Sequence, residues 1–425
     1  MKRFLIRASF DPYRQYEAKD FILTAHAGLN SGNLMFAYGV MNALTTDDTI
    51  IESTYKHKWS EKDASEINER YDAFILPMAD AFRDDFVPML DEYTKLIKLL
   101  KIPVVVIGIG LRAKIDEAPT IDRPFDANAY NFVKEVLNHS SLIGLRGRNT
   151  GKYLEKLGFK EDRDFTPIGC PSLYTYGTAV STRIPGKIEN LVINTNTLAP
   201  REVSDFIINS ARKTKDYWLV QQKYYEMRDM FVGNHTFIGR KTVEHVFDEE
   251  TFSRLNHEDK IRYFFNVPEW LAFMKDKDLF LGNRFHGSVA AILAGTPHVF
   301  ISFDARTKEL IDFHHVTSLP HRQLDGTKSI YDYLDKLDFK SFEKHHTDNF
   351  THYLDFLEKN GLDHIFKEKK GYAMGESVME KKIAMQSAPI LHCFKSLSKT
   401  EQFKRIASTD VSVGKALLQK LMGRA

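Results

Sequence analysis

The feature that most constrains the fold is a recurring unit of the chain. In it a short apolar run ends in a Gly- or Asn-containing turn, a helical pattern follows, and another apolar run begins. The run Pro-Val-Val-Val-Ile at residues 103–107 is apolar throughout and mostly β-branched. A strand of this kind is buried on both faces, as in a parallel sheet covered by helices. The recurring unit therefore predicts an α/β protein built on parallel sheets.

The unit occurs three times, stops and then restarts, which predicts two domains. The first half shows expected strands at 21–25, 73–76 and 141–146 and expected helices at 33–44 and 86–100. Turn formers then crowd residues 177–186. After them strands are expected at 191–193, 217–220 and 278–282, with a helix opening at Pro268. We expect an N-terminal domain at 1–182, a C-terminal domain at 183–349 and a cleft between them, followed by a helical extension at 350–425.

Composition narrows the class of protein. The 425 residues carry 59 Lys and Arg against 57 Asp and Glu, a net charge of +2, which argues against nucleic-acid binding through a global basic field. Two cysteines, Cys170 and Cys393, exclude a disulfide scaffold and fit a reducing cytoplasm. No apolar stretch reaches the roughly 18 residues of a membrane helix, and the N-terminus lacks the apolar core of a signal peptide. We therefore expect a soluble cytoplasmic protein.

The stretch with most chemistry runs from Leu281 to Ser302 and predicts a strand, a sharp turn, a short helix and a second strand. The turn lies at the carboxyl end of a parallel strand, where open α/β sheets bind ligands. Gly287 lies at the helix N-terminus, which favours an anion. Arg284 can bind a phosphate or carboxylate bidentately, and His286 can donate or accept a proton. The alternative is a buried His286 that caps the turn, with Arg284 in an internal ion pair.

Further cations follow other predicted strands. Arg306 and Lys308 come after the strand that ends near Ser302, and Arg146 ends the strand at 141–146. They could add positive charge to the anion site, although ordinary surface charge and a salt bridge explain them equally well. His26, Asn30 and Asn33 lie in the first Gly-containing turn and could line an acceptor pocket, although turn and cap roles explain them slightly better.

Several classes of site are not supported by the motifs. The sequence contains no GxxxxGK[ST] phosphate-binding loop, no HExxH and no GxSxG. The pairs His314-His315 and His345-His346 are neighbours on the chain, and such pairs do not readily point at one metal ion. We expect no metal site.

The ordered set of motifs resembles the polysaccharide pyruvyl transferase family over roughly residues 20–320. The matching segments, in order, are His26–Asn33, Val104–Gly110, Ser141–Arg148, Gly169–Ser172, Arg284-Phe-His286-Gly and Gly295-x-Pro297 before Asp304. Two departures from the family pattern stand out. Leu76-Pro-Met-Ala-Asp80 replaces a Gly pair after the second family strand, and Asp304-x-Arg306 replaces Asp-x-Lys.

The resemblance implies a fold and an activity. Family members have two Rossmann-like domains arranged as in GT-B glycosyltransferases, with a deep interdomain cleft. They transfer pyruvate from phosphoenolpyruvate to a sugar of a cell-surface polysaccharide or its precursor, form a ketal and release phosphate, without a cofactor. His286 is then the expected general acid. The expected substrate-binding residues are Arg284, Arg146, Arg306, Lys308, Asn283, Gly287 and Asn33.

Two other functions fit the same residues. A GT-B-type glycosyltransferase could hold the diphosphate of a nucleotide sugar at the anion site, and a non-catalytic binding protein could keep the fold alone. The tail from Lys395 carries seven basic and two acidic residues. We expect its helices to pack on the body with solvated charge outside. The alternative hypothesis is that this basic tail contacts anionic lipid at the inner face of the membrane, where the acceptor could be lipid-linked.

Overall fold

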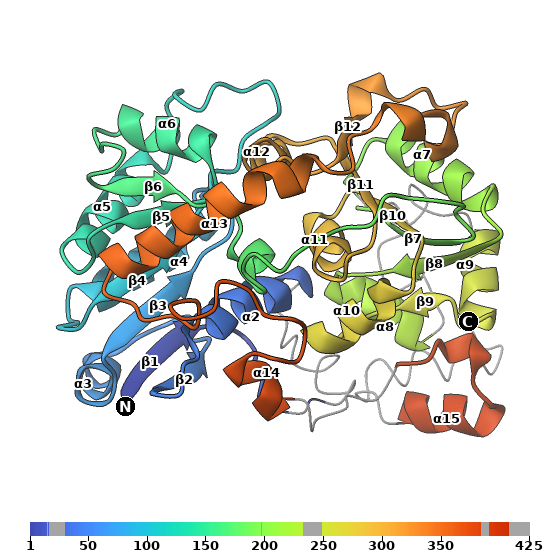
Figure 1. The fold of residues 1–425 in the computed structure, drawn as a ribbon. Coiled ribbons are helices and arrows are strands. Elements are labelled where there is room, and N and C mark those ends of the chain that lie inside the picture. Colours follow the sequence, from blue (N-terminus) through green and yellow to red (C-terminus); the bar gives the residue numbers. More distant parts are fainter. Residues whose placement is uncertain (15, 17–29, 197, 233–248, 384–390, 408–425) are drawn as a thin grey trace.

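The protein consists of two α/β halves that lie side by side in the computed structural model (Figure 1). The structure describes residues 1–14, 16, 30–196, 198–232, 249–383 and 391–407. Each half is built on parallel strands, and the expected α/β fold with two Rossmann-like units is confirmed. Among the described residues, no helix is long and apolar enough to cross a membrane.

The first half contains a four-stranded parallel sheet in the order β2-β1-β3-β4. A parallel pair, β5-β6, extends this sheet through a bridge between Ile109 and Leu145. Its strands are β1 (Lys2–Arg7), β2 (Thr49–Thr54), β3 (Ala73–Pro77), β4 (Val104–Ile107), β5 (Ile143–Leu145) and β6 (Phe165–Pro167). Its helices are α2 (Gly32–Leu44), α3 (Glu61–Arg70), α4 (Val87–Ile97), α5 (Asp126–Leu137) and α6 (Arg148–Lys156).

The second half contains a six-stranded parallel sheet in the order β12-β11-β10-β7-β8-β9. Its strands are β7 (Asn190–Asn194), β8 (Asp216–Val220), β9 (Ile261–Arg262), β10 (Leu279–Gly282), β11 (His298–Ser302) and β12 (Ser318–Pro320). Its helices are α7 (Arg201–Arg212), α8 (Tyr224–Val232), α9 (Glu249–His257), α10 (Val267–Lys275), α11 (Phe285–Leu293) and α12 (Ala305–His314). The order is that of the doubly wound dinucleotide-binding fold, which reverses between β7 and β10.

The α-helices described after the second sheet are α13 (Ser341–Lys359), α14 (Val378–Ile383) and α15 (Lys399–Ala407). In Figure 1, α13 runs back across the first half. There Tyr353 stacks on Tyr174 with ring centroids 4.8 Å apart, and the imidazole of His352 lies 2.7 Å from the Thr166 hydroxyl. The predicted boundary at residue 350 falls within α13. Residues 408–425 of the basic tail lie outside the described residues, so membrane contact stays a prediction.

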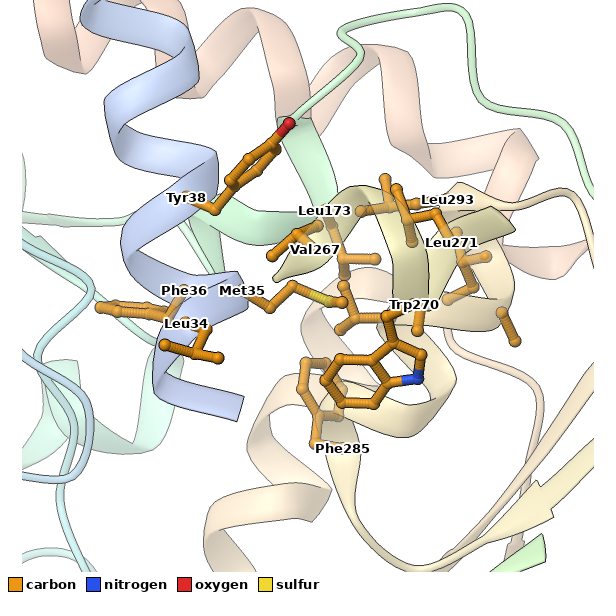
Figure 2. Close-up of a cluster of buried hydrophobic side chains, with 14 of the residues drawn as sticks. Leu34, Met35, Phe36, Tyr38, Leu173, Val267, Trp270, Leu271, Phe285 and Leu293 are labelled. Atoms are coloured by element: carbon orange, nitrogen blue, oxygen red, sulfur yellow. The ribbon is translucent and has the colours of Figure 1, made fainter. Parts of the chain in front are cut away.

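The helix α2 belongs to the first half but packs into the second. Figure 2 shows Met35 of α2 pointing toward Val267 and Trp270 of α10 and Phe285 of α11, while Leu34 lies on the side of α2 away from them. All five side chains are buried in one apolar cluster that includes residues of both halves. Burial of this much apolar surface holds the two halves together next to the carboxyl ends of their strands.

The strand predictions were right in part. The strands expected at 73–76 and 141–146 and the helix expected at 33–44 are present as β3, β5 and α2. The expected strand at 21–25 lies outside the described residues. The sequence analysis did not predict β1, in which only Phe4, Leu5 and Ile6 are apolar between basic residues. These three are buried because β1 is an inner strand, paired with β2 and β3.

Candidate active site

The turn after β10 lies at the point where the order of the second sheet reverses. Asn194, the last residue of the neighbouring strand β7, accepts hydrogen bonds through its Oδ1 from the backbone N–H groups of Asn283 (3.1 Å) and Arg284 (3.2 Å). A Cβ on Gly282 or Gly287 would lie 2.1 or 2.4 Å from the amide atoms of Asn194. Both glycines are therefore required for this close approach, and the structure places Gly287 against Asn194.

Arg284 is buried and already has partners. Its Nε donates to the carbonyl oxygen of Thr195 at 2.8 Å, and its Nη2 forms an ion pair with Glu226 on α8. The second carboxylate oxygen of Glu226 accepts backbone N–H groups from Gln222 and Lys223 at 3.2 and 3.0 Å. This is the internal ion pair that the sequence left open as an alternative. Nothing in the sequence around Glu226 indicated that it would be the partner.

Asn283 lies beside Arg284 and is only partly satisfied. Its Nδ2 lies 3.4 Å from the hydroxyl oxygen of Thr195, and its Oδ1 is buried without a hydrogen-bond partner in the part of the chain that the structure describes. Ser288, one turn into α11, has a buried hydroxyl in the same condition. A buried polar atom that lacks a partner is costly, and such atoms are often satisfied by a ligand or water.

His286 lies on the first turn of α11 with its ring between the two halves. Its Nε2 is 3.8 Å from the Sγ of Cys170, and its Nδ1 faces Gly32 at the start of α2, where a Cβ would come within 2.4 Å. Burial, and then the positive charges of Arg146 and Arg306, lower the pKa of His286 from 6.5 to about 3. The imidazole is therefore neutral at physiological pH in the free protein.

Arg146 is also buried, but its guanidinium differs from that of Arg284 in its hydrogen-bond and ion-pair partners. It follows β5, its guanidinium lies over the ring of Phe36 at 5.6 Å, and only 3% of the residue is exposed. Its Nε has no hydrogen-bond partner, and no carboxylate pairs with the guanidinium, among the described residues. Burying an unpaired cation is expensive, so a guanidinium in this state is prepared to receive an anion.

Arg306 joins the two halves through Asp80. Its Nη1 lies 3.4 Å from Asp80 Oδ2, which follows β3 in the first half. Arg83 and Arg112 also pair with this carboxylate, at 3.3 and 2.8 Å. Burial alone would raise the pKa of Asp80, but the surrounding arginines hold it well below its usual value. Asp80 follows β3 by three residues, and Arg146 follows β5 directly, so the same search for polar residues after strands could have found it.

Two predicted residues lie away from this group. Lys308 forms an ion pair with Asp312, one helical turn along α12, and is half exposed, so the structure does not bring it to His286. Asn33 is exposed on the first turn of α2, while Asn30 accepts the N–H of Gly32 at 2.9 Å as a turn cap. His26 lies outside the described residues.

One cavity lies between the halves, with an empty volume of about 420 Å³ including its mouth. It is lined by Phe10, Pro12, Arg14, Tyr16, Tyr38, Phe265, Asn266, Val267, Pro268 and Ile383. None of the predicted site residues lines this cavity. Among the described residues, no three His, Cys, Asp or Glu side chains are grouped so that they could hold a metal ion.

Comparison with known proteins decides the family. Residues 30–304 match the sequence model for polysaccharide pyruvyl transferase. The chain belongs to the polysaccharide pyruvyl transferase family. The match includes Arg146, Arg284 and His286 and confirms the resemblance seen in the motifs. Arg306 lies two residues beyond its end. Members of this family are transferases, and the name of the family indicates a sugar or polysaccharide acceptor.

The solved structures that resemble this family member include three UDP-GlcNAc 2-epimerases. The Neisseria meningitidis enzyme, bound to UDP-GlcNAc, is 10% identical with a TM-score of 0.42, over 85% of this chain and 100% of that one. The Methanocaldococcus jannaschii enzyme is 12% identical with a TM-score of 0.40, over 84% and 99%. A putative one from Listeria monocytogenes is 11% identical with a TM-score of 0.37, over 93% of each chain. No curated protein matched.

Proposed function

We propose that this chain transfers pyruvate from phosphoenolpyruvate to a sugar of a cell-surface polysaccharide or of its precursor. The product is a ketal that joins two sugar hydroxyls, and phosphate leaves. The observation that carries the proposal is Arg146, a buried guanidinium without a carboxylate partner among the described residues. It lies in a member of the pyruvyl transferase family, and its charge acts on His286 together with that of Arg306.

The donor is an anion with two charged groups, a phosphate and a carboxylate. In the proposal Arg146 and Arg306 bind these groups, because their guanidinium groups offer paired donors for planar anions. The positive end of the α11 helix dipole, beside Gly287 and Asn283, adds a favourable field for an anion. Arg284 is held by Glu226 through its Nη2 and by Thr195 through its Nε, so the proposal does not rely on it for donor binding.

The bound donor also prepares His286 for proton transfer. In the free protein burial, and then the charges of Arg146 and Arg306, lower the pKa of His286 to about 3. The negative charge of the donor offsets these cations and raises that pKa, so His286 becomes a usable acid when the donor is present. It then protonates C3 of the donor, which leaves positive charge at C2.

The remaining steps make and break bonds at C2, and the neutral imidazole of His286 takes up the first proton that is released. One sugar hydroxyl attacks C2, and its proton returns to His286. The bond from C2 to the phosphate oxygen breaks, and the second hydroxyl attacks C2 to close the ketal, its proton leaving with phosphate. C3 becomes a methyl group. No step in this sequence consumes an oxidant or a metal ion.

The test measures donor binding and donor chemistry in three proteins: wild type, Arg146→Met and Arg148→Met. Arg148 is an exposed arginine two residues away and serves as the matched control. Phosphoenolpyruvate is expected to raise the melting temperature of wild type and Arg148→Met, but not of Arg146→Met. Phosphate release with a sugar acceptor in D₂O should yield a deuterated ketal methyl group. A response to UDP or GDP with none to phosphoenolpyruvate would instead indicate glycosyl transfer and overturn the proposal.

A further inference from the structure

A second group of cations lies on the carboxyl rim of the first sheet. The order β2-β1-β3-β4 reverses between β1 and β3, and this is where an open α/β sheet offers a ligand site. Arg7 ends β1, and its Nη1 donates to the carbonyl oxygen of Pro77 at the end of β3, at 3.3 Å. The first sheet therefore has an arginine at its own switch point, separate from Arg146 at the end of β5.

Arg7 is held by aromatic rings and not by carboxylates. Its guanidinium carbon lies 5.4 Å from the ring centroid of Tyr55 and 5.8 Å from those of Phe86 and Tyr93. Its Nε donates to the hydroxyl oxygen of Tyr93 at 2.9 Å. No ion pair to Arg7 is found among the described residues. Tyr55 is 41% exposed, so this aromatic cluster opens to solvent.

A continuous set of contacts leads from Arg7 to the donor site. The ring of Phe86 lies between two guanidinium groups, 5.8 Å from Arg7 and 5.1 Å from Arg83. Arg83 pairs with Asp80 at 3.3 Å, and Asp80 pairs with Arg306 at 3.4 Å. The rim of the first half is thus connected side chain by side chain to the cation that we assign to the donor.

We call Arg7, Arg83 and Arg112 the arginine strip. Arg83 and Arg112 share the carboxylates of Asp80 and Asp85, at distances from 2.8 to 3.5 Å. Asp80 is shared in addition with Arg306, which also pairs with Asp304. The side chains of Arg83 and Arg112 are 23% and 50% exposed. Arg83 and Arg112 are therefore accessible to solvent, and Arg7 has no carboxylate partner among the described residues.

We propose that the arginine strip binds an anionic group of the acceptor, so that the substrate class is an acidic or phosphorylated sugar. This inference rests on the proposed function. Guanidinium groups recognise phosphate and carboxylate through paired hydrogen bonds. The exposed ring of Tyr55 offers an apolar face beside them, on which the C–H face of a sugar packs. An acceptor anchored here extends its hydroxyls along the contacts that lead to Arg306.

The experiment measures binding of three probes by calorimetry at saturating phosphoenolpyruvate, so that the donor site is filled. The probes are glucose 1-phosphate, glucuronate and methyl glucoside. Wild type is expected to bind at least one anionic probe at least fivefold more tightly than methyl glucoside, with an affinity that falls as salt is added. Comparing the affinities for glucose 1-phosphate and glucuronate shows whether the strip prefers a phosphate or a carboxylate. Equal binding of neutral and anionic probes, or no binding of the anionic probes, would overturn the inference.

Variants locate the binding surface. Arg112→Gln changes a half-exposed side chain and is expected to fold. Arg7→Lys keeps the charge but loses the fork of donors. Each should weaken binding of the anionic probe at least fivefold, whereas Arg70→Gln, an exposed arginine on α3 of the same half, should leave it unchanged. Unchanged binding in both strip variants would also overturn the inference.

The same samples separate this inference from the proposed function. Phosphoenolpyruvate binding and phosphate release are measured alongside. The protein could fail to bind or consume phosphoenolpyruvate while Arg112→Gln still loses binding of the anionic probe. That result would support the arginine strip as an anion site and refute phosphoenolpyruvate as the donor. Normal donor binding in Arg112→Gln with unchanged probe binding would support the donor and refute the strip.

Discussion

Replacing Arg146 by Met should leave the free protein as stable as wild type or more stable, while abolishing its response to phosphoenolpyruvate. A buried charge without a partner costs several kcal/mol relative to water. The favourable interactions of Arg146 are one cation–π contact with Phe36 at 5.6 Å, worth about 0.5–2 kcal/mol, and longer-range attraction by Asp80 and Glu309. Met removes the desolvation cost and keeps apolar contact with the ring. We expect the free energy of unfolding to rise by about 1–2 kcal/mol.

The assay is urea unfolding with and without phosphoenolpyruvate. At 100 times its dissociation constant the donor should stabilise wild type by about 2.7 kcal/mol. It should add nothing measurable to Arg146→Met. Comparing midpoints at an unchanged slope ensures that the same unfolding transition is measured. Two results would refute the reasoning: a loss of stability in the free variant, which would make Arg146 structural, or a retained response to the donor.

Three further predictions concern the turn after β10 and the glycine of α2 that faces it. Arg284→Met should lower the free energy of unfolding by about 3–5 kcal/mol, because it leaves Glu226 buried without its cation; the double variant with Glu226→Gln should recover part of this in urea unfolding, and an unchanged midpoint in the single variant would contradict the pairing. The pKa of His286 is about 3 in the folded protein, and its usual value is 6.5. As the pH drops from 6.5 toward 3, the unfolded chain therefore binds a proton before the folded protein does, and the free energy of unfolding falls. The His286→Gln variant should lose less of this free energy between pH 7 and 5 than wild type; an equal loss would mean that His286 is not the group responsible. Gly32→Ala places a Cβ 2.4 Å from Nδ1 of His286 and should lower kcat at least tenfold, whereas Gly326→Ala, with open space around it, should not; equal kcat in the two variants would show that the ring tolerates displacement.

The part of the site that the sequence predicted is local. The apolar run, sharp turn and Ala-rich helix at 279–293 appear as β10 and α11, because short-range pattern determines where a strand ends and a helix begins. Arg146 and Arg306 follow their strands for the same reason, and the carboxyl ends of parallel strands share one rim. The family resemblance added the order of these pieces along the chain.

The partners of these residues could not be predicted, because they come from distant parts of the chain. Glu226 is 58 positions from Arg284, and Asp80 is 226 positions from Arg306. No local pattern indicates which carboxylate a strand-end arginine will meet. Lys308 is the opposite case, because its partner is close in the sequence. It pairs with Asp312, one helical turn along α12. The strand β1 was missed because its burial comes from two neighbouring strands and not from its own short apolar run.

The acidity of His286 depends on how the two halves dock. Burial lowers its pKa most, and the two charges that lower it further come one from each half: Arg146 follows β5, and Arg306 lies in the first turn of α12. Its ring is confined by Gly32 of the first half and lies 3.8 Å from Cys170. Separating the halves would hydrate the imidazole and remove one of the two cations, and both changes would return the pKa toward its usual value. The interface therefore keeps His286 neutral in the free protein, and under the proposed function it makes the protonation of His286 depend on the donor anion.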